Sequence, residues 1–585
     1  MAEGPGGSAS LCNRDWVDLG KDVTDAALAR LCEELAVSEV LGRILAARRL
    51  GEVDEARRFL HPDETQLHPP HLMLGMAEGV GRIYAALQNY EKILIFGDYD
   101  VDGTAAATIL YSYLKKLGGR VHYFIPNRLT DGYGLHAGSV EKFKAWGVEL
   151  VITADHGSTA VEGARALAQR GIELIVTDHH QIGRTNPECV AIINPHRPGC
   201  PYPFKQLSAA GVAFKVISAL DQFLEEVDFW DLRGIRRTPP SYFLDLVAMA
   251  TVADMSPLVG ENRVLVKLGL DAINARPRPG ISGLIRECNI RGAITPTTIS
   301  FKLAPKINAL GRIGDPRLGV QLFTSHSFTE SRKIARFLVE TNRERKVIEQ
   351  EVFGHALKQL ARFRDEPACV LVGGDWHPGV VGPIASRMAF QTGKPTVALT
   401  LWRSPEATGS ARSGEGFDVL DALAACESLL HRFGGHPKAA GLSLHPDNLD
   451  AFTRSFHEAV GRGAGEHGQA KHRELRIDAW VTPAMLNSAT FEELARLSPF
   501  GFGNPEPVLA MRRITVDKTA WHHSRHLRLD LRGPMGREME GMAWDSPDLE
   551  VATGRSYDVA FVPRLLGRPA GSTPQLKVLD FLPCA

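Results

Sequence analysis

Apolar and polar positions alternate along the chain in blocks that predict short buried strands and helices in turn. From residue 92 onward, short apolar runs predict strands, and the segments between them have helical spacing. The predicted elements are strand 92–97, helix 104–117, strand 120–125, helix 138–146, strand 149–154, helix 160–170, strand 172–177 and the apolar run 190–193. Strands that alternate with helices build a parallel, doubly wound sheet, so we expect an α/β fold here.

Other patterns surround this block. A helical pattern covers 1–75, and a long helix is predicted over 327–364, where only Gly354 interrupts the pattern. A second, smaller α/β unit is predicted from strands 368–373, 396–401 and 439–444 and helix 380–392. Beyond residue 474, short strand-like runs broken by Gly and Pro predict a small β-barrel. We therefore divide the chain at 1–75 (N-terminal helical region), 76–326 (first α/β domain), 327–364 (linking helix), 365–460 (second, smaller α/β domain) and 474–585 (small β-barrel).

Three predicted strands end abruptly in acid or histidine. The run before Asp98-Tyr99-Asp100-Val101-Asp102-Gly103 is the first, and Asp155-His156-Gly157 and Asp178-His179-His180 follow the other two. A fourth acid, Asp254, ends the apolar helical run 243–252. Ligands of open α/β sheets sit beyond the carboxyl ends of the strands, so we expect these side chains to share one crevice.

Carboxylate oxygens and imidazole nitrogens are ligands for divalent cations, and closely spaced carboxylates repel each other until a cation neutralises them. Acids alone suit Mg²⁺, whereas His179 favours Mn²⁺. The alternative is that Asp98–Gly103 only caps a helix or forms a calcium loop, and that each remaining acid is a turn residue. Three strand ends of this kind favour a pair of metal ions.

Composition and charge narrow the class of protein. The chain has 44% hydrophobic and 23% charged residues, a net charge of −1 and eight scattered cysteines. This is an ordinary globular composition, without a C-x-x-C pair for zinc or a disulfide framework. We expect a cytoplasmic protein, because neither a secretory signal nor a membrane-spanning run is evident. One basic stretch, 302–346, has ten Lys or Arg against four Asp or Glu. It is either a solvated helix face or a surface that follows a nucleic-acid backbone.

These motifs, in this order, resemble the DHH phosphoesterase superfamily and, within it, the RecJ single-strand-specific exonucleases. The matching segments are Gly97–Gly103, Asp155–Gly157, Asp178–His180, Val252–Asp254, Gly311–Pro316, Gly374–Gly379, Ser410–Ser413 and Phe433–His436. The resemblance runs from about residue 92 to 445, and the C-terminal β-region fits the family's OB-like module. The resemblance then implies that 76–326 is similar to the catalytic DHH domain, 365–460 to the substrate-binding DHHA1 domain and 474–585 to the OB-like domain of the family.

The resemblance implies a role for individual residues. Two ions, Mn²⁺ or Mg²⁺, would be held by Asp100, Asp102, Asp155, His179 and Asp254, with Asp98 as a further ligand or a neighbour of one. Asp155 would bridge the ions, and His180 would point at the scissile phosphate. In the DHHA1-like domain, the glycines would let backbone N–H groups approach phosphate oxygens. The implied substrate-binding residues are Arg128, Arg312, Arg412, Ser413, Gly434, Gly435 and His436.

The hypothesis from the resemblance is a metal-dependent, 5′→3′ exonuclease for single-stranded DNA in repair and recombination. It would act as a monomer, with a single-strand-binding protein or a helicase as a possible partner. A phosphodiesterase for short oligonucleotides or cyclic dinucleotides is one alternative, and a non-catalytic nucleic-acid-binding scaffold is another. In the β-module, Trp521, His522, His523, Arg525 and Arg528 mix rings with cations as base-stacking surfaces do, although Trp521 fits a barrel core equally well. Residues 231–240 have no assigned role.

Overall fold

The computed structural model describes residues 10–127, 131–132, 134–414, 417–464, 473–547, 549–566 and 573–584. The chain forms two compact units. The first contains residues up to Leu67, the segment Pro257–Lys267 and the chain from Ala470 onward. The second contains His68–Ser256 and Leu268–Gln469, which cover the two predicted α/β domains except for the segment Pro257–Lys267.

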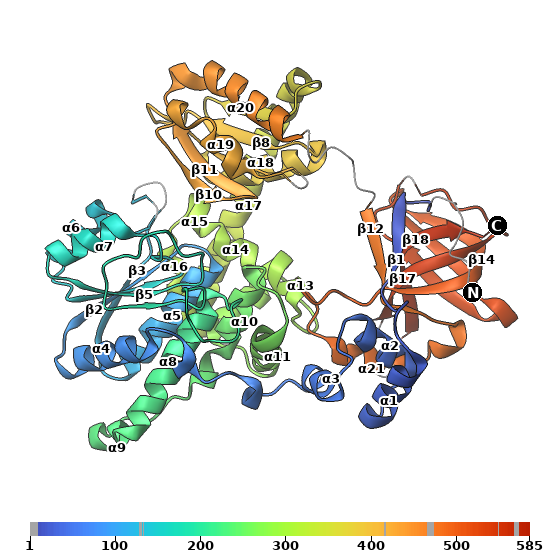
Figure 1. Cartoon of the computed structure of the whole chain (residues 1–585), viewed down its shortest axis with the longest axis horizontal. Coiled ribbons are helices and arrows are strands. Elements are labelled where there is room, and N and C mark those ends of the chain that lie inside the picture. Colours follow the sequence, from blue (N-terminus) through green and yellow to red (C-terminus); the bar gives the residue numbers. More distant parts are fainter. Residues whose placement is uncertain are drawn as a thin grey trace. The chain divides into compact units, whose positions relative to one another are not determined.

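A five-stranded parallel sheet organises the first half of the second unit (Figure 1). Its strands are β2 (Lys92–Gly97), β3 (Arg120–Phe124), β4 (Leu150–Ala154), β5 (Glu173–Thr177) and β6 (Ala191–Ile193). The order β3-β2-β4-β5-β6 places β2 between its two successors in the chain. The strand order therefore reverses beside β2 and β4, which is where doubly wound sheets bind ligands.

Helices cover both faces of this sheet. On one face, α6 (Ala137–Ala145) and α7 (Val161–Gln169) pack over an apolar core that contains Phe96, Phe143 and Leu167. The other face carries α4 (Met76–Gln88), α5 (Val101–Lys116) and α8 (Ala209–Glu226), which contact one another or the sheet. Helix α10 (Leu244–Ala253) packs against α5 and α8 and is buried along its length. The predicted α/β fold is confirmed.

Further helices lead to the second sheet. They are α9 (Phe229–Arg233), α11 (Gly260–Ala275), α12 (Pro279–Glu287), α13 (Pro296–Thr298), a π-helical turn (Ile299–Leu303), α14 (Ala304–Asn308), α15 (Leu310–Ile313), α16 (Arg317–Thr324) and α17 (Phe328–Gln359). Helix α17 is continuous over 32 residues, where the pattern predicts the linking helix. Arginines on α17 pair with Glu287, Glu340 and Glu349. Part of the basic stretch is therefore an ion-paired helix face.

The second α/β domain has a mixed five-stranded sheet of order β10-β11-β9-β8-β7. Its elements are β7 (Cys369–Gly373), α18 (Pro378–Thr392), β8 (Thr396–Thr400), β9 (Ala407–Arg412), α19 (Val419–Ala424), β10 (Arg432–His436), β11 (Ala439–Leu444) and α20 (Leu449–Ala464). The glycines 434 and 435, which the sequence pattern does not predict as a strand, lie in edge strand β10. Pairing with β11 supplies the order that glycine lacks on its own.

The first unit is built around a closed barrel of β14 (Leu509–His522), β15 (His526–Arg532), β16 (Glu538–Ala543), β18 (Thr573–Pro583) and β17 (Ser556–Leu566). Strands β14 and β17 pair and close it. Short strand β13 (Ala479–Trp480) extends β14, and helix α21 (Ser488–Leu494) lies in the preceding segment. The predicted OB-like barrel is confirmed, with β16 as a strand that the sequence pattern did not indicate.

The N-terminal region belongs to this barrel unit. It contains helices α1 (Asp25–Leu35), α2 (Glu39–Ala47) and α3 (Val53–Leu60), and in addition strand β1 (Arg14–Asp18), which pairs with β12 (Arg473–Ile477). Leu41 and Ile44 share one apolar core with Leu497, Val516 and Phe561. The N-terminal helices and the C-terminal barrel therefore build one hydrophobic core, and the described part of the predicted helical region contains α1, α2, α3 and two short 3₁₀ turns besides β1.

Two arginines form hydrogen bonds that connect the segments around this shared core. Arg48, on the N-terminal side, donates to both carboxylate oxygens of Asp478 and to the Asn504 side chain. Arg263, which is buried and stacks on Phe59, donates to the carbonyl oxygens of Phe59, Arg496, Leu497 and Ser498. Burial lowers the pKa of Arg263 to about 10. Its carbonyl partners compensate for the loss of water, as buried charges require.

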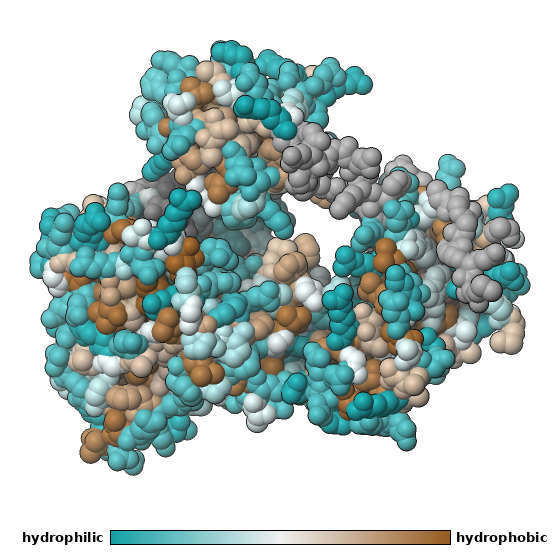
Figure 2. Space-filling view, viewed as in Figure 1, coloured by the Kyte–Doolittle hydropathy of each residue, from teal (hydrophilic) through white to brown (hydrophobic). Residues whose placement is uncertain are grey.

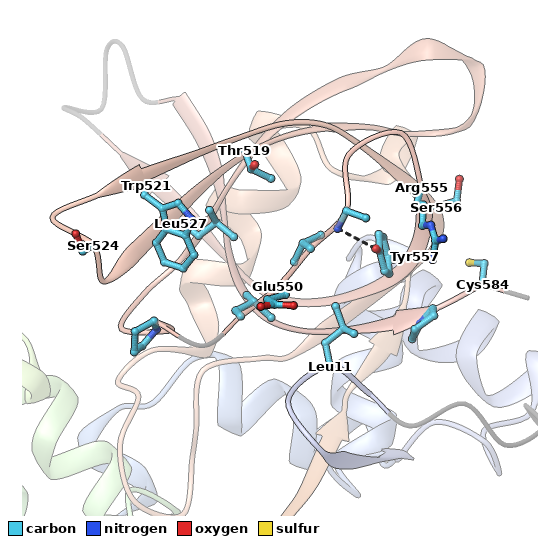
Figure 3. Close-up of a pocket in the computed structure, with 15 residues that line it drawn as sticks. Leu11, Thr519, Trp521, Ser524, Leu527, Glu550, Arg555, Ser556, Tyr557 and Cys584 are labelled. Atoms are coloured by element: carbon cyan, nitrogen blue, oxygen red, sulfur yellow. Dashed lines mark hydrogen bonds between the residues drawn. The ribbon is translucent and has the colours of Figure 1, made fainter.

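A groove of about 1350 Å³ lies on the barrel between the β14–β15 hairpin and the segment that precedes β17 (Figure 3). Trp521 and Leu527 face each other across the hairpin and line the groove together. The Tyr557 hydroxyl accepts a hydrogen bond from the Ala552 amide at the other side. Trp521 is 47% exposed, so it is a surface residue of the barrel and not part of its core.

On the face shown in Figure 2, apolar side chains are scattered among hydrophilic ones in each unit. Within the described part of the chain, no helix has the length and apolar character that crossing a membrane requires.

Leu41→Ala should destabilise the barrel although Leu41 lies far from it in sequence. Leu41 is fully buried in the shared core, so its truncation should cost about 2–5 kcal/mol. Hydrogen–deuterium exchange should accelerate in β14 and β17 of this variant. Met535→Ala is the matched control, because Met535 is 99% exposed on the same unit. Unchanged exchange in L41A would show that the N-terminal helices do not support the barrel.

Candidate metal centre

The first acidic turn follows β2. Asp98 accepts a hydrogen bond from the Tyr99 amide, and Asp100 is the N-cap of α5, where its side chain accepts from the Gly103 amide. A side chain at position 103 would collide with Asp98, with its Cβ 2.6 Å from that of Asp98. Glycine is therefore required for the chain to turn this tightly. Helix capping by Asp100, considered above as an alternative to metal binding, is real and occurs in the same turn.

Asp102 lies in the first turn of α5 and points at the N-terminus of α8. Its carboxylate oxygens accept hydrogen bonds of 2.7 and 2.8 Å from the amides of Ala209 and Ala210. Ser208 caps α8 and sits beside Thr251 of α10. The free amides and the dipole of α8 favour a negative charge at this point, so they offset part of the cost of burying the Asp102 carboxylate.

Asp155 follows β4 and has a positive φ of 72°. This left-handed conformation is strained for most residues but is tolerated by aspartate and asparagine. The next residue, His156, is buried and donates from Nε2 to the Phe96 carbonyl, while burial lowers its pKa to about 4. His156 is therefore a neutral support for β2, and the turn directs Asp155 into the crevice.

The third turn, after β5, is organised by Asp178. Its Oδ1 accepts from the amides of His179 and His180 and pairs with His180 Nδ1 at 2.8 Å, while Oδ2 accepts from the Ser158 amide. Asp178 is thus not aimed at the crevice. It fixes the two histidines that follow it, and these bonds outweigh burial and lower the pKa of Asp178.

Every residue predicted as a metal ligand joins one of three overlapping groups whose ligand atoms lie within 4.8 Å of one another. The groups are Asp155, His179 and His180; Asp102, His179 and Asp254; and Asp98, Asp100 and Asp155. Asp155 and His179 each belong to two groups. Asp254, at the end of α10, accepts from the Ser256 hydroxyl. The structure therefore brings the predicted ligands together, with Asp155 between two groups.

The electrostatics of the cluster are those of crowded buried acids. Burial, reinforced by Asp254, raises the pKa of Asp102 to about 7. Burial and the neighbouring carboxylates also raise the pKa of Asp100 and, more strongly, that of Asp155. For His179, the surrounding acids outweigh burial and raise the pKa. Asp178 does the same for His180 and raises its pKa to about 9.

Two buried atoms test whether this cluster fits divalent ions. Asp155 Oδ1 and His179 Nε2 are buried, have no hydrogen-bond partner in the described structure and lie 3.1 Å apart. Such unsatisfied polar atoms are costly unless a ligand or ion engages them. Hard carboxylate oxygens and imidazole nitrogens are also the donor set of Mn²⁺ and, for the oxygens, of Mg²⁺. The residues present fit a two-ion centre.

A cleft of about 770 Å³ opens beside the cluster within the second unit. His179 and His180 line one side of it, and Gly435 and His436 of β10 line another. His180 is the exposed member, with 54% of its side chain accessible. The pKa of His436 is lowered by burial and then by Arg412. Of the predicted substrate-binding residues, Gly435 and His436 therefore face the centre directly.

The other predicted substrate-binding residues differ in position. Arg412 donates to the hydroxyls of Ser386 and Ser410, and Arg312 donates to the Gly379 carbonyl. The Ser413 hydroxyl is engaged within its own loop, with the carbonyls of Gly414 and Phe417. Gly434 lies in β10 but not among the residues that line the cleft. Arg128 lies outside the described residues.

Two supporting residues, Asn308 and Asn194, escaped the sequence analysis. Asn308 accepts from the Val101 amide and holds the first turn. Gly311, which lies in a segment matched above, leaves room for the Tyr99 ring. Asn194 follows β6, the next strand along the sheet, and bonds to Ser158 and to the His180 carbonyl. A polar residue directly after an apolar run was the available signal for Asn194. Asn308 gives no such signal, because only the folded chain brings it near residue 101.

The family comparisons match three segments. Residues 92–251 match the DHH family, N-terminal domain; residues 365–462 match the DHHA1 domain; and residues 477–580 match the RecJ OB domain. Among curated proteins, the chain is similar to the single-stranded-DNA-specific exonuclease RecJ of several bacteria. It is 36% identical to that of Dickeya dadantii, over 80% of this chain and 82% of the relative.

The protein of Bacillus subtilis is 33% identical over 86% of this chain, which spans only 62% of that relative's length. Among solved structures, RecJ of Thermus thermophilus in complex with Mn²⁺ matches with a TM-score of 0.81 and 27% identity, covering 97% of this chain and 80% of that one. A structure of exonuclease RecJ bound to manganese matches with a TM-score of 0.58 and 32% identity, covering 67% and 95%.

The pKa shifts predict how the metal-free protein responds to pH. Asp100, Asp102 and Asp155 have raised pKa values, so the folded state binds more protons than the unfolded state between about pH 4 and 7. The free energy of unfolding should therefore fall as pH rises through this window. The lowered pKa of His156 acts in the opposite direction, but it concerns one group against three. Thermal unfolding in chelator should show this slope. Asp155→Asn, which keeps the tolerated positive φ, should flatten it.

If the thermal stability of D155N fell with pH as steeply as that of the parent, Asp155 would not contribute to the pH dependence. Addition of Mn²⁺ should stabilise the parent protein more at pH 8 than at pH 5.5, since protons compete with the ion for the same oxygens.

Proposed function

Because the chain belongs to the RecJ family of single-stranded-DNA-specific exonucleases, we propose that it hydrolyses single-stranded DNA from the 5′ end by a two-metal mechanism. The observation that carries this proposal is the convergence of the turns after β2, β4 and β5 into overlapping ligand groups that share Asp155 and His179. The chain covers less than two thirds of the length of the Bacillus subtilis relative. We therefore propose the whole activity for this chain from the geometry of its own site.

Asp98, Asp100, Asp102, Asp155, His179 and Asp254 would hold two ions, Mn²⁺ or Mg²⁺. Such a pair supplies the activation of water and the stabilisation of the attacking and leaving oxygens in an in-line displacement. Asp155, which belongs to two of the ligand groups, would serve both ions. The α8 amides and the Asp100 cap keep the remaining carboxylates in place, so the oxygen positions are set before substrate binds.

His180 would contact the scissile phosphate. In the metal-free protein Asp178 outweighs burial and raises the pKa of His180, and the exposed ring opens on the cleft. Asp178 holds Nδ1, which leaves Nε2 to donate to a phosphoryl oxygen. Across the cleft, His436 and the backbone at Gly435 would hold the nucleotide. No covalent enzyme intermediate is needed.

The alternatives share the metal motifs but not the barrel. A phosphodiesterase for dinucleotides has no use for the exposed Trp521 and the large groove of the barrel unit, whereas a long strand can use both. A non-catalytic scaffold has no need for buried acids with unsatisfied atoms. We further propose a monomer in the cytoplasm that serves DNA repair and recombination, in cooperation with a single-strand-binding protein or a helicase.

The central experiment compares 5′-labelled and 3′-labelled single strands, with duplex controls, in Mn²⁺ and in Mg²⁺. We expect the 5′ label to be released first as a mononucleotide, with little hydrolysis of the duplex. Asp155→Asn should lower the rate by at least about 10³-fold without loss of the fold, because one side chain joins two ligand groups. Activity confined to dinucleotides would support the phosphodiesterase instead, and DNA binding without hydrolysis in either metal would support the scaffold.

We propose that Arg412, whose charge acts on His436 beside the cleft, helps to bind the 5′ phosphate together with Arg128 and Arg312, the arginines to which the resemblance gives that selection. A charge-assisted hydrogen bond contributes about 1.5–3 kcal/mol, so Arg412→Ala should raise KM for 5′-phosphorylated strands by about 10–100-fold. Strands with a 5′ hydroxyl should be affected much less. Arg454→Ala, an exposed arginine on α20 of the same domain, is the control. An equal loss on both kinds of strand would remove Arg412 from phosphate selection.

A further inference from the structure

We propose that Asn194 is a positioning residue that holds His180 in its working orientation from the end of β6. The inference rests on the proposed function, in which His180 contacts the scissile phosphate. Asn194 is fully buried and follows directly after β6, which is the edge strand beside β5. The turns after β2, β4 and β5 supply side chains of the metal centre, and the turn after β6 would hold those side chains in place.

The hydrogen bonds of Asn194 join two turns. Its Nδ2 donates to the Ser158 hydroxyl, after β4, and to the His180 carbonyl, after β5, each at 2.9 Å. Its Oδ1 accepts from the His196 amide at 2.8 Å, which fixes the orientation of the side-chain amide. Ser158 in turn donates its amide to Asp178, and Asp178 holds the His180 ring. The network therefore closes around His180, from its backbone through Asn194 and from its ring through Asp178.

His180 depends on this network because packing holds its ring on one side only. More than half of its side chain is exposed, in contrast to 14% for His179, and its ring meets the His179 ring with centroids 4.5 Å apart. A ring with so little packing keeps one orientation only if hydrogen bonds define it. The His180 ring stands 3.7 Å from the Asp155 carboxylate, so a small displacement of the turn changes its place relative to the ligand groups. Displacements of about 1 Å can lower a rate by about 10²-fold.

The variant N194D isolates one bond of the network. The introduced carboxylate can still accept from the His196 amide, and the Ser158 hydroxyl can rotate to donate to it. It cannot donate to the His180 carbonyl. We expect N194D to lower kcat by about 10–100-fold at pH 8, with KM for single-stranded DNA changed by less than about threefold. When pH falls, the buried introduced carboxyl group should become protonated and donate again, so the activity of N194D relative to the parent should recover.

Ser158→Ala is the matched control. It removes one partner of Asn194 but leaves both the bond to the His180 carbonyl and the Ser158 amide in place. Its kcat should fall less than that of N194D. The proposal would be overturned if the activity of N194D relative to that of the parent did not change with pH. It would also be overturned if N194D kept the kcat of the parent and only unfolded at a lower temperature.

A second measurement does not require nuclease activity. Modification of His180 by diethylpyrocarbonate, mapped by mass spectrometry on the metal-free protein, should be faster in N194D than in the parent or in S158A, because the ring is held less firmly. An unchanged modification rate would refute the positioning role whatever the substrate. If instead the parent protein fails to hydrolyse single-stranded DNA while the modification rates differ as expected, the proposed function fails and the positioning of His180 stands.

Discussion

Repulsion among buried carboxylates is the constraint on which this centre depends. Asp100, Asp102 and Asp155 are buried close together, and the fold raises their pKa values instead of separating them. A cluster of like charges persists in a folded protein only where other interactions hold it. Here the holding groups are backbone amides: those of α8 for Asp102 and that of Gly103 for Asp100. The chain thus builds a site whose charges need a cation to balance them.

The parallel sheet makes this convergence possible without long loops. Strands β2 and β4 are neighbours although α5, β3 and α6 separate them in the sequence, so their ends meet at the point where strand order reverses. At the end of β4 the chain adopts positive φ values at Asp155 and Gly157, and a Cβ at position 157 would meet Thr153 at 2.9 Å. Local strain therefore aims Asp155 into the crevice, as is common at functional sites.

The features that could be predicted from the sequence are those that depend on the pattern of residues close together in the chain. The strands of the first sheet end within one residue of their predicted limits, because buried parallel strands are continuous apolar runs. The ligands were found because they follow those runs directly. Strands β1 and β10 were missed, since the first pairs with a strand more than 450 residues away and the second contains glycines that only its partner β11 keeps extended. Asn308 was missed because only tertiary structure gives it a partner.

The same distinction separates two kinds of residue at the centre. The acids are held by backbone groups of helices and turns, which change little with the side chains around them. His180 is held through side chains, by Asp178 at its ring and Asn194 at its carbonyl, and it remains exposed to the cleft. A ligand for an ion benefits from fixed oxygens, whereas a group that meets substrate must be reachable as well as oriented. A hydrogen-bonded histidine with a largely exposed ring satisfies both requirements, and its dependence on the buried Asn194 amide follows from that compromise.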